Sequence, residues 1–223
     1  MTSFPPDSSP STLPLRGPYT AAASSPRGRG DRADRPLPPG FRVGRYELRR
    51  PLGVGASGRV YEAYDPELDR ALAVKLMKSL TPDAVVRLRA EARALARLSH
   101  PNVVEVYDVG RIEADGSERL YVAMALLSGG TVGQWIAVEA PQWSRILDVF
   151  IGVADGLAAA HGAGLIHRDM KPENILLGVG DLPKIVDFGL ARPDSPDGDA
   201  VDARLGARKG QLIGSPAYMA PEL

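Results

Sequence analysis

The 223-residue sequence contains no cysteine, which excludes disulfides, cysteine-ligated zinc, iron–sulfur clusters and thiol nucleophiles. No apolar run approaches the roughly 20 residues that a membrane-spanning helix needs, so no membrane segment is predicted in this chain. The first residues have neither a basic nor an apolar segment, so no signal peptide is predicted. Basic and acidic residues number 27 each, and this balance predicts no nucleic-acid partner. We therefore expect a cytoplasmic protein.

The remaining composition, 44% hydrophobic and 24% charged, is that of a globular protein. It changes sharply near residue 40. Residues 1–40 are rich in proline, serine and arginine and have no helical or strand period. Such a segment buries too little apolar surface to offset its ordering entropy, so we expect a disordered tail.

After Phe41 the sequence alternates short apolar runs with turns, which predicts strands followed by helices. Helices are expected at residues 82–98, with Thr81 as N-cap, and at residues 144–161. Strands are expected at residues 46–52, 59–65, 71–77, 103–109 and 120–127, with short runs at 175–177 and 184–186. Strands followed by helices indicate an α+β chain in two lobes.

A glycine-rich turn, Gly53-Val54-Gly55-Ala56-Ser57-Gly58, separates the first two of these strands. Glycines at this spacing let backbone N–H groups approach phosphate oxygens. Because a strand follows instead of a helix, the turn does not fit a dinucleotide-binding fingerprint. An ordinary hairpin turn explains the motif equally well.

Lys75 lies in an apolar strand, on the same face as Ala73 by the strand period of two. A buried lysine needs a partner. Glu91 offers one, because it shares the core-facing stripe of the helix at residues 82–98 with Leu88 and Leu95. We predict a Lys75–Glu91 ion pair; the alternative is that both side chains face solvent.

Two polar motifs follow, His167-Arg168-Asp169-Met170-Lys171-Pro172-Glu173-Asn174 and Asp187-Phe188-Gly189. An aspartate beside a substrate hydroxyl can accept its proton. The oxygen atoms of asparagine and aspartate are hard ligands suited to Mg²⁺. Either motif alone is compatible with a polar loop. The two together, following a glycine-rich turn and a strand lysine in the sequence, favour a catalytic or metal-binding site.

Taken together, the chain resembles the eukaryotic-like serine/threonine protein kinases of bacteria. The matching segments in residues 46–222 are GVGASGRV, AVK, HRDMKPEN, DFG and SPAYMAPE, in the family's order. The resemblance implies a two-lobed fold. Residues 41–127 would form an N-lobe with a five-stranded antiparallel sheet and one helix. Residues 128–223 would form a mainly helical C-lobe that lacks the family's later helices.

The resemblance also implies roles for individual residues. Asp169 would orient or deprotonate the substrate hydroxyl, and Lys171 would contact the transferred phosphate. Lys75 would hold the ATP phosphates and pair with Glu91. Asn174 and Asp187 would bind Mg²⁺. ATP contacts are expected from Leu52, Gly53, Gly55, Gly58, Val60, Ala73, Lys75, Met124, Ala125 and Leu127.

A regulatory stack is implied for Leu95, Val106, His167 and Phe188. In this family Arg168 usually indicates control by a phosphate on the segment that follows Asp187, but residues 187–222 contain no threonine. Ser195 is the remaining candidate switch, and Ser215 matches a substrate-binding position. A flexible polar loop is the favoured interpretation of this segment.

The predicted function is ATP-dependent phosphorylation of serine and threonine in protein substrates. The alternative is a nucleotide- or partner-binding module that is inactive because the C-lobe is incomplete. A small-molecule phosphotransferase is disfavoured by the SPAYMAPE segment. The helix at residues 144–161 would keep an apolar face in water, so a partner or a further C-terminal segment is expected to cover it.

Overall fold

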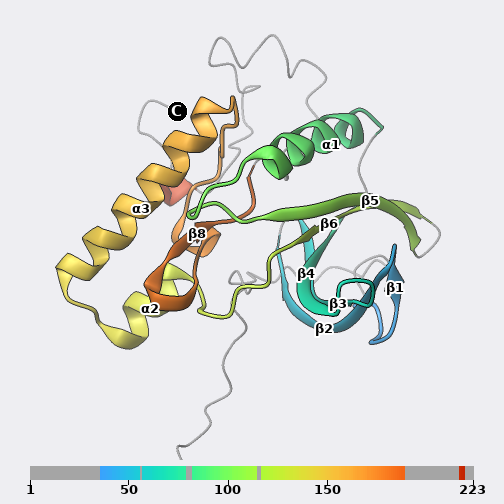
Figure 1. The fold of residues 1–223 in the computed structure, drawn as a ribbon, viewed down its shortest axis with the longest axis horizontal. Helices are drawn as coiled ribbons and strands as arrows, with labels where there is room; N and C mark the ends of the chain where they lie inside the picture. The colour runs from blue at the N-terminus through green and yellow to red at the C-terminus, as the bar shows by residue number, and fades with distance from the viewer. Residues whose placement is uncertain (1–35, 56, 79–81, 115–116, 189–215, 219–223) are drawn as a thin grey trace, which may run out of the picture.

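The computed structural model describes residues 36–55, 57–78, 82–114, 117–188 and 216–218. Most of the predicted tail, the Thr81 cap, Gly189, Ser195 and Ser215 lie outside these residues. Within them the predicted α+β architecture is confirmed: a twisted sheet with one helix on one side of the molecule, and helices around a small hairpin on the other (Figure 1).

The main sheet is antiparallel and has the strand order β1-β2-β3-β4-β6-β5. Its strands are β1 (Arg42–Val43), β2 (Tyr46–Val54), β3 (Gly58–Asp65), β4 (Arg70–Met77), β5 (Val106–Ala114) and β6 (Ser117–Met124). All five predicted strands are present. The short β1, which pairs with the start of β2, is an addition that the sequence did not predict.

Strand β4 separates two apolar cores because its side chains alternate between the two faces of the sheet. Ala73 and Met77 belong to the core that continues into the other lobe. Leu72, Val74 and Leu76 belong to a second core on the opposite face, together with Tyr46 and Tyr121. The face predicted for Lys75, shared with Ala73, is therefore the one directed toward the other lobe.

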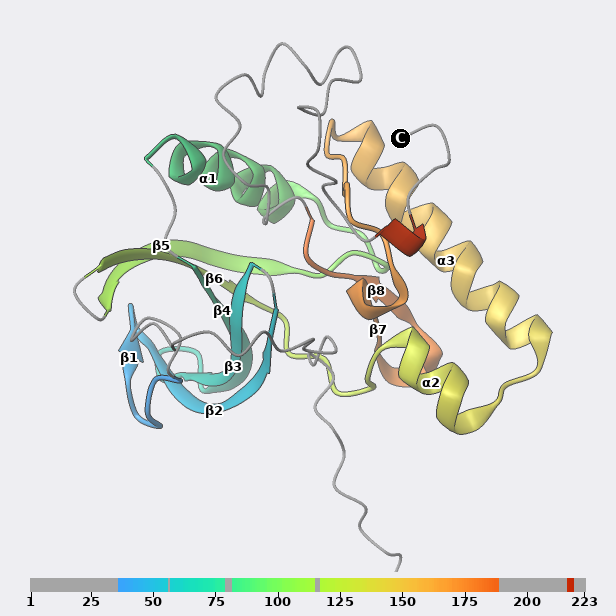
Figure 2. The same cartoon turned by 180° about the vertical axis from the view of Figure 1, so that it is seen from behind.

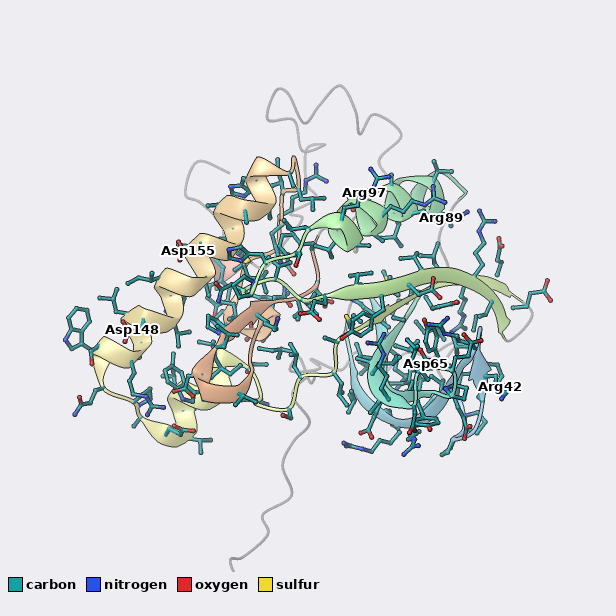
Figure 3. All side chains as sticks on the ribbon, viewed as in Figure 1. Arg42, Asp65, Arg89, Arg97, Asp148 and Asp155 are labelled. Atoms are coloured by element: carbon teal, nitrogen blue, oxygen red, sulfur yellow. The ribbon has the colours of Figure 1, made fainter. Side chains whose placement is uncertain are left out.

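Helix α1 (Pro82–Arg97) packs along β5. Leu88 and Leu95 of the predicted stripe are buried, and so is Ala92, whereas Glu91 of that stripe is about one-third exposed. Figure 3 labels Arg89 and Arg97 on the same helix. This amphipathic arrangement holds α1 against the sheet by apolar contacts.

The second lobe contains α2 (Val132–Glu139), α3 (Trp143–Gly162) and the hairpin of β7 (Ile175–Leu177) with β8 (Pro183–Ile185) (Figure 2). Single turns of 3-10 helix lie at Pro172–Asn174, Val179–Asp181 and Pro216–Tyr218. The sequence analysis did not predict α2. None of the helices in the described part of the chain is long and apolar enough to span a membrane.

The loop after α1 joins the two lobes by pairing with β8. The Val104 amide donates to the Ile185 carbonyl at 3.0 Å, and the Ile185 amide donates to the Asn102 carbonyl at 2.9 Å. The buried Asn102 side chain also donates to the Pro183 carbonyl at 3.0 Å. Because the backbone groups of Asn102 and Val104 are bonded to β8, they are not available to the main sheet. Strand β5 therefore begins at Val106 and not at residue 103 as predicted.

Helix α3 approaches this junction through glycine. A Cβ atom at Gly156 would lie 2.9 Å from the Asn102 carbonyl oxygen and 3.0 Å from Ile185 Cδ1. The Gly156→Ala variant should therefore push α3 away from β8 and lower the free energy of unfolding by about 1–3 kcal/mol. Urea denaturation measures this change.

Gly162→Ala is the matched control, since a Cβ there meets nothing within 4 Å. It should leave stability unchanged or raise it slightly, because alanine is the better helix former. Equal stability of the two variants would contradict the close packing inferred at Gly156.

Candidate active site

Lys75 is the buried cation of the site. It lies in β4 opposite Val60 of β3 and Val122 of β6, and only 1% of its surface is exposed. Its Nζ atom lies 2.8 Å from Asp187 Oδ1. The predicted pairing with Glu91 is wrong in this arrangement, because the carboxylate that follows β8 takes the position beside the ammonium group.

The ion pair leaves the ammonium group incompletely satisfied. Lys75 Nζ is inaccessible to solvent, and its contact with Asp187 is not aligned as a hydrogen bond. An ammonium group carries three N–H donors, and a buried donor without an acceptor is costly. The position therefore favours a further anionic oxygen, such as one from a phosphate group.

Glu91 instead faces the loop between α3 and β7. Its Oε1 atom lies 3.6 Å from the Arg168 guanidinium, and both side chains are about one-third exposed. Arg168 has a φ of +67° and Asp187 a φ of +65°. Left-handed conformations at residues other than glycine cost free energy and cluster at functional sites.

Asp169, Lys171 and Asn174 meet in the loop between α3 and β7. Lys171 Nζ donates to Asp169 Oδ2 at 2.6 Å. Asn174 Nδ2 donates to the Asp169 carbonyl at 2.7 Å and lies 3.4 Å from its carboxylate. The structure thus brings these three predicted site residues together and holds the Asp169 carboxylate from two sides.

His167 fastens this loop to the strand before Asp187. Its Nε2 atom lies 2.8 Å from the Val186 carbonyl, which can only accept, so Nε2 carries the proton. Its Nδ1 atom accepts from the Asp169 amide at 3.3 Å. Burial lowers the pKa of His167 below its ordinary value of 6.5. The neutral ring is therefore the form that fits both hydrogen bonds.

Five of the apolar residues predicted to contact ATP belong to one apolar cluster: Leu52, Val60, Ala73, Met124 and Leu127. Ala125 packs against it, and its amide donates to the Glu105 carbonyl at 2.9 Å. The predicted stack joins the same cluster through Leu95, Val106 and Phe188. The rings of His167 and Phe188 lie 4.9 Å apart, centre to centre.

The glycine-rich turn joins β2 to β3 and requires glycine at one position for steric reasons. The Gly55 amide donates to the Gly58 carbonyl at 2.8 Å. A Cβ atom at Gly58 would collide with the Leu76 carbonyl of β4. Gly53 is paired with Val60 in the β2–β3 ladder. Gly58 therefore lies directly beside β4, the strand that carries Lys75.

The site offers few oxygen ligands for a metal, which suits a metal ion that is also coordinated by phosphate oxygens. Among the described residues, no three histidine or acidic side chains gather as a metal site. Asp187 supplies one carboxylate, and Asn174, which donates through Nδ2, has its amide oxygen as a second hard donor. Mg²⁺ is bound in this way, by one or two protein oxygens completed by substrate phosphates and water.

Asn102, which ties the loop after α1 to β8, was not predicted from the sequence. The helix expected at residues 82–98 ends at the Ser99-His100-Pro101 break, and Asn102 follows it directly. The signal was the short polar side chain directly after that break, since such residues often bond to backbone groups of neighbouring segments.

Comparisons with known proteins agree with this geometry. The profile described as "Protein kinase domain" matches residues 46–223. Serine/threonine-protein kinase PknA of Mycobacterium tuberculosis is 39% identical over 184 residues, which are 80% of this chain and 41% of that protein. PknE of the same organism is 39% identical over 187 residues, covering 82% and 31%. The chain thus spans less than half the length of these relatives.

Solved structures are also similar to this chain. The Mycobacterium tuberculosis PknI kinase domain has a TM-score of 0.61 and 32% identity, with 73% of this chain and 68% of that chain covered. The structure described as "PpkA-294 apo form" has a TM-score of 0.61 and 28% identity, with 70% and 63% covered.

The lowered pKa of His167 predicts a pH dependence of stability. Below pH 6.5 the imidazole takes up a proton in the unfolded chain but stays neutral in the native chain. The contribution of His167 to the free energy of unfolding is therefore fully present above pH 6.5, and it decreases as the pH falls toward the lowered pKa. His167→Gln should remove this component, and its unfolding free energy should change less between pH 6.5 and more acid solution. The exposed His161→Gln is the control. If the free energy of unfolding of wild type and of His167→Gln had the same pH dependence, the lowered pKa of His167 would not be the cause of the acid destabilisation.

Proposed function

The chain belongs to the protein kinase family, and from this premise we propose that it transfers the γ-phosphate of ATP to serine and threonine hydroxyls of protein substrates. The observation that carries the proposal is that Asp187, the partner of Lys75, follows Val186, whose backbone is hydrogen-bonded to His167 and Asn174. These two residues belong to the loop in which Asp169, Lys171 and Asn174 meet. Its relatives PknA and PknE are serine/threonine kinases by name.

Lys75 and the glycine-rich turn would bind the nucleotide phosphates. The buried ammonium group favours an anionic oxygen, and the glycine-rich turn ends at Gly58, which is adjacent to the lysine strand; glycines allow close approach of a phosphate to such a backbone. The cluster of Leu52, Val60, Ala73, Met124 and Leu127 would enclose the base. Asn174 and Asp187 would hold Mg²⁺, which supplies neutralisation of the phosphate charge.

Asp169 would act on the substrate hydroxyl. A bond forms between the hydroxyl oxygen and the γ-phosphorus, the bond from that phosphorus to the bridging oxygen of ATP breaks, and the proton passes to the Asp169 carboxylate. Lys171 and Asn174 hold this carboxylate in position before the reaction. Catalysis then rests on positioning and charge neutralisation.

A second function, nucleotide or partner binding without transfer, is favoured by one observation. Helix α3 keeps an apolar face exposed, with Trp143 73%, Ile151 51% and Phe150 41% accessible. Exposed apolar surface of this kind marks interaction sites. We propose that a further C-terminal segment or a partner covers this face. We also infer that the domain works in the cytoplasm, where ATP and protein substrates occur.

Phosphate transfer is the test of the proposal. The chain is incubated with Mg-ATP and a pool of serine, threonine and tyrosine peptides, and the products are read by mass spectrometry. Wild type should phosphorylate serine or threonine peptides. Asp169→Asn should lower the transfer rate at least about 100-fold, the usual contribution of a general base, while Mg-nucleotide binding measured by calorimetry persists. Asp187→Asn should weaken that binding as well.

The control is Asp155→Asn, an exposed aspartate of α3 (Figure 3). It should behave as wild type. Transfer that survives Asp169→Asn would overturn the assigned role. Nucleotide binding without transfer, in protein shown to be folded, would establish the second function.

A further inference from the structure

Three arginines form a line along the solvent side of α1. Arg89, Arg93 and Arg97 follow one another at intervals of four residues, the spacing that places side chains on one face of a helix. Arg93 and Arg97 are exposed and Arg89 is partly exposed, whereas Leu88 and Leu95 of the same helix are buried. Figure 3 labels the two arginines at the ends of this line. We call these three residues the arginine row.

The arginine row differs from the arginines of the neighbouring sheet in having no partner. Arg45 and Arg50 form ion pairs with acidic side chains, and Arg49 lies over an aromatic ring. In the described part of the chain, the three arginines of the row have neither an ion pair nor a ring contact. Like charges four residues apart repel one another and destabilise a helix. The stability of α1 therefore does not explain the row, and an anionic partner would relieve the repulsion.

The spacing of the arginine row matches that of side chains on an extended peptide. Four residues of an α-helix advance about 6 Å along its axis. Two residues of an extended chain advance about 6.6 Å and return to the same side of the chain. Acidic residues at alternate positions of an extended peptide therefore meet successive arginines. Ala90 and Ala96, which are exposed beside the row, have small side chains that leave room for the peptide backbone.

Membranes and nucleic acids fit this surface less well. A helix that binds a membrane inserts an apolar face into it, but the apolar face of α1 is buried in the core beside β5. Nucleic-acid binding draws its affinity from many phosphate contacts. The arginine row offers three cations, in a chain whose formal net charge is zero. A short acidic peptide is the anionic partner that matches its size.

We propose that the arginine row is a docking site for an extended segment of a partner protein that carries acidic residues at alternate positions. Each guanidinium group can bind a carboxylate through two parallel N–H donors. Such contacts are weak in exposed positions and are screened by salt, so the docking is transient and depends on ionic strength. The proposal goes beyond phosphate transfer and does not depend on it.

Fluorescence anisotropy tests the docking site, with the full chain and a labelled Asp-Ala-Asp-Ala-Asp peptide at low ionic strength. Wild type should bind this peptide, and its affinity should fall as salt is added. Arg93→Gln should weaken binding by up to about fivefold, the upper worth of an exposed ion pair. Arg93→Lys should have a smaller effect, because lysine keeps the charge but not the paired donors. Replacing Arg89, Arg93 and Arg97 together by glutamine should abolish binding.

The control variant is Arg42→Gln, which removes an exposed arginine on β1, across the main sheet from α1 (Figure 3). It should bind as wild type does. An Asp-Asp-Asp-Ala-Ala peptide, of equal charge, should bind more weakly because its acidic residues do not share one side of the chain.

Thermal unfolding verifies that each variant is folded. No binding by folded wild type, undiminished binding by the triple variant, or equal affinity for the two peptides overturns the docking site. Binding to phosphatidylserine vesicles or duplex DNA in place of the peptide overturns it as well. Because none of these measurements involves phosphate transfer, the proposed function stands in each case.

Discussion

The ammonium group of Lys75 lies inside a core of aliphatic side chains, and a charge in such surroundings must be neutralised within the fold. The strands on both sides of β4 keep water away from it. Asp187 reaches it from the other lobe, directly after β8, with its backbone in a left-handed conformation. An ion pair therefore joins the two lobes beside their shared apolar core, and whatever binds Asp187 also changes the partner of Lys75.

The two sides of the site are held with different strength. The loop between α3 and β7 is fixed by hydrogen bonds that involve backbone groups: Val186 to His167 and to Asn174, and Asn174 to Asp169. Helix α1, in contrast, contacts the loop through the side-chain pair of Glu91 and Arg168. The position of Asp169 therefore depends mainly on the backbone of the segment that follows β8.

Sequence periodicity predicted what depends on neighbouring residues. The alternation along β4 placed Lys75 on the correct face, and helical spacing gave the buried stripe of α1. It did not give the partner of Glu91, because Arg168 is distant in sequence and the choice depends on how α1 sits on the sheet. Helix α2 was missed although Thr131 and Gln134 form a capping box, a signal readable from sequence.

Helix α3 has an exposed apolar face on one side and packs on the other side against the strand that precedes Asp187. On the inner side of α3, Gly156 has no side chain, so the helix backbone can approach Asn102 and Ile185 closely. Ile185 is two residues before Asp187, and Asn102 holds the same strand from the other side. Burying the outer face, where Trp143 and Phe150 are accessible, would stabilise α3 and with it the strand that positions Asp187. Changes at the outer face of α3 would thus reach Asp187 through Gly156, Ile185 and Asn102, without any contact between that face and the site itself.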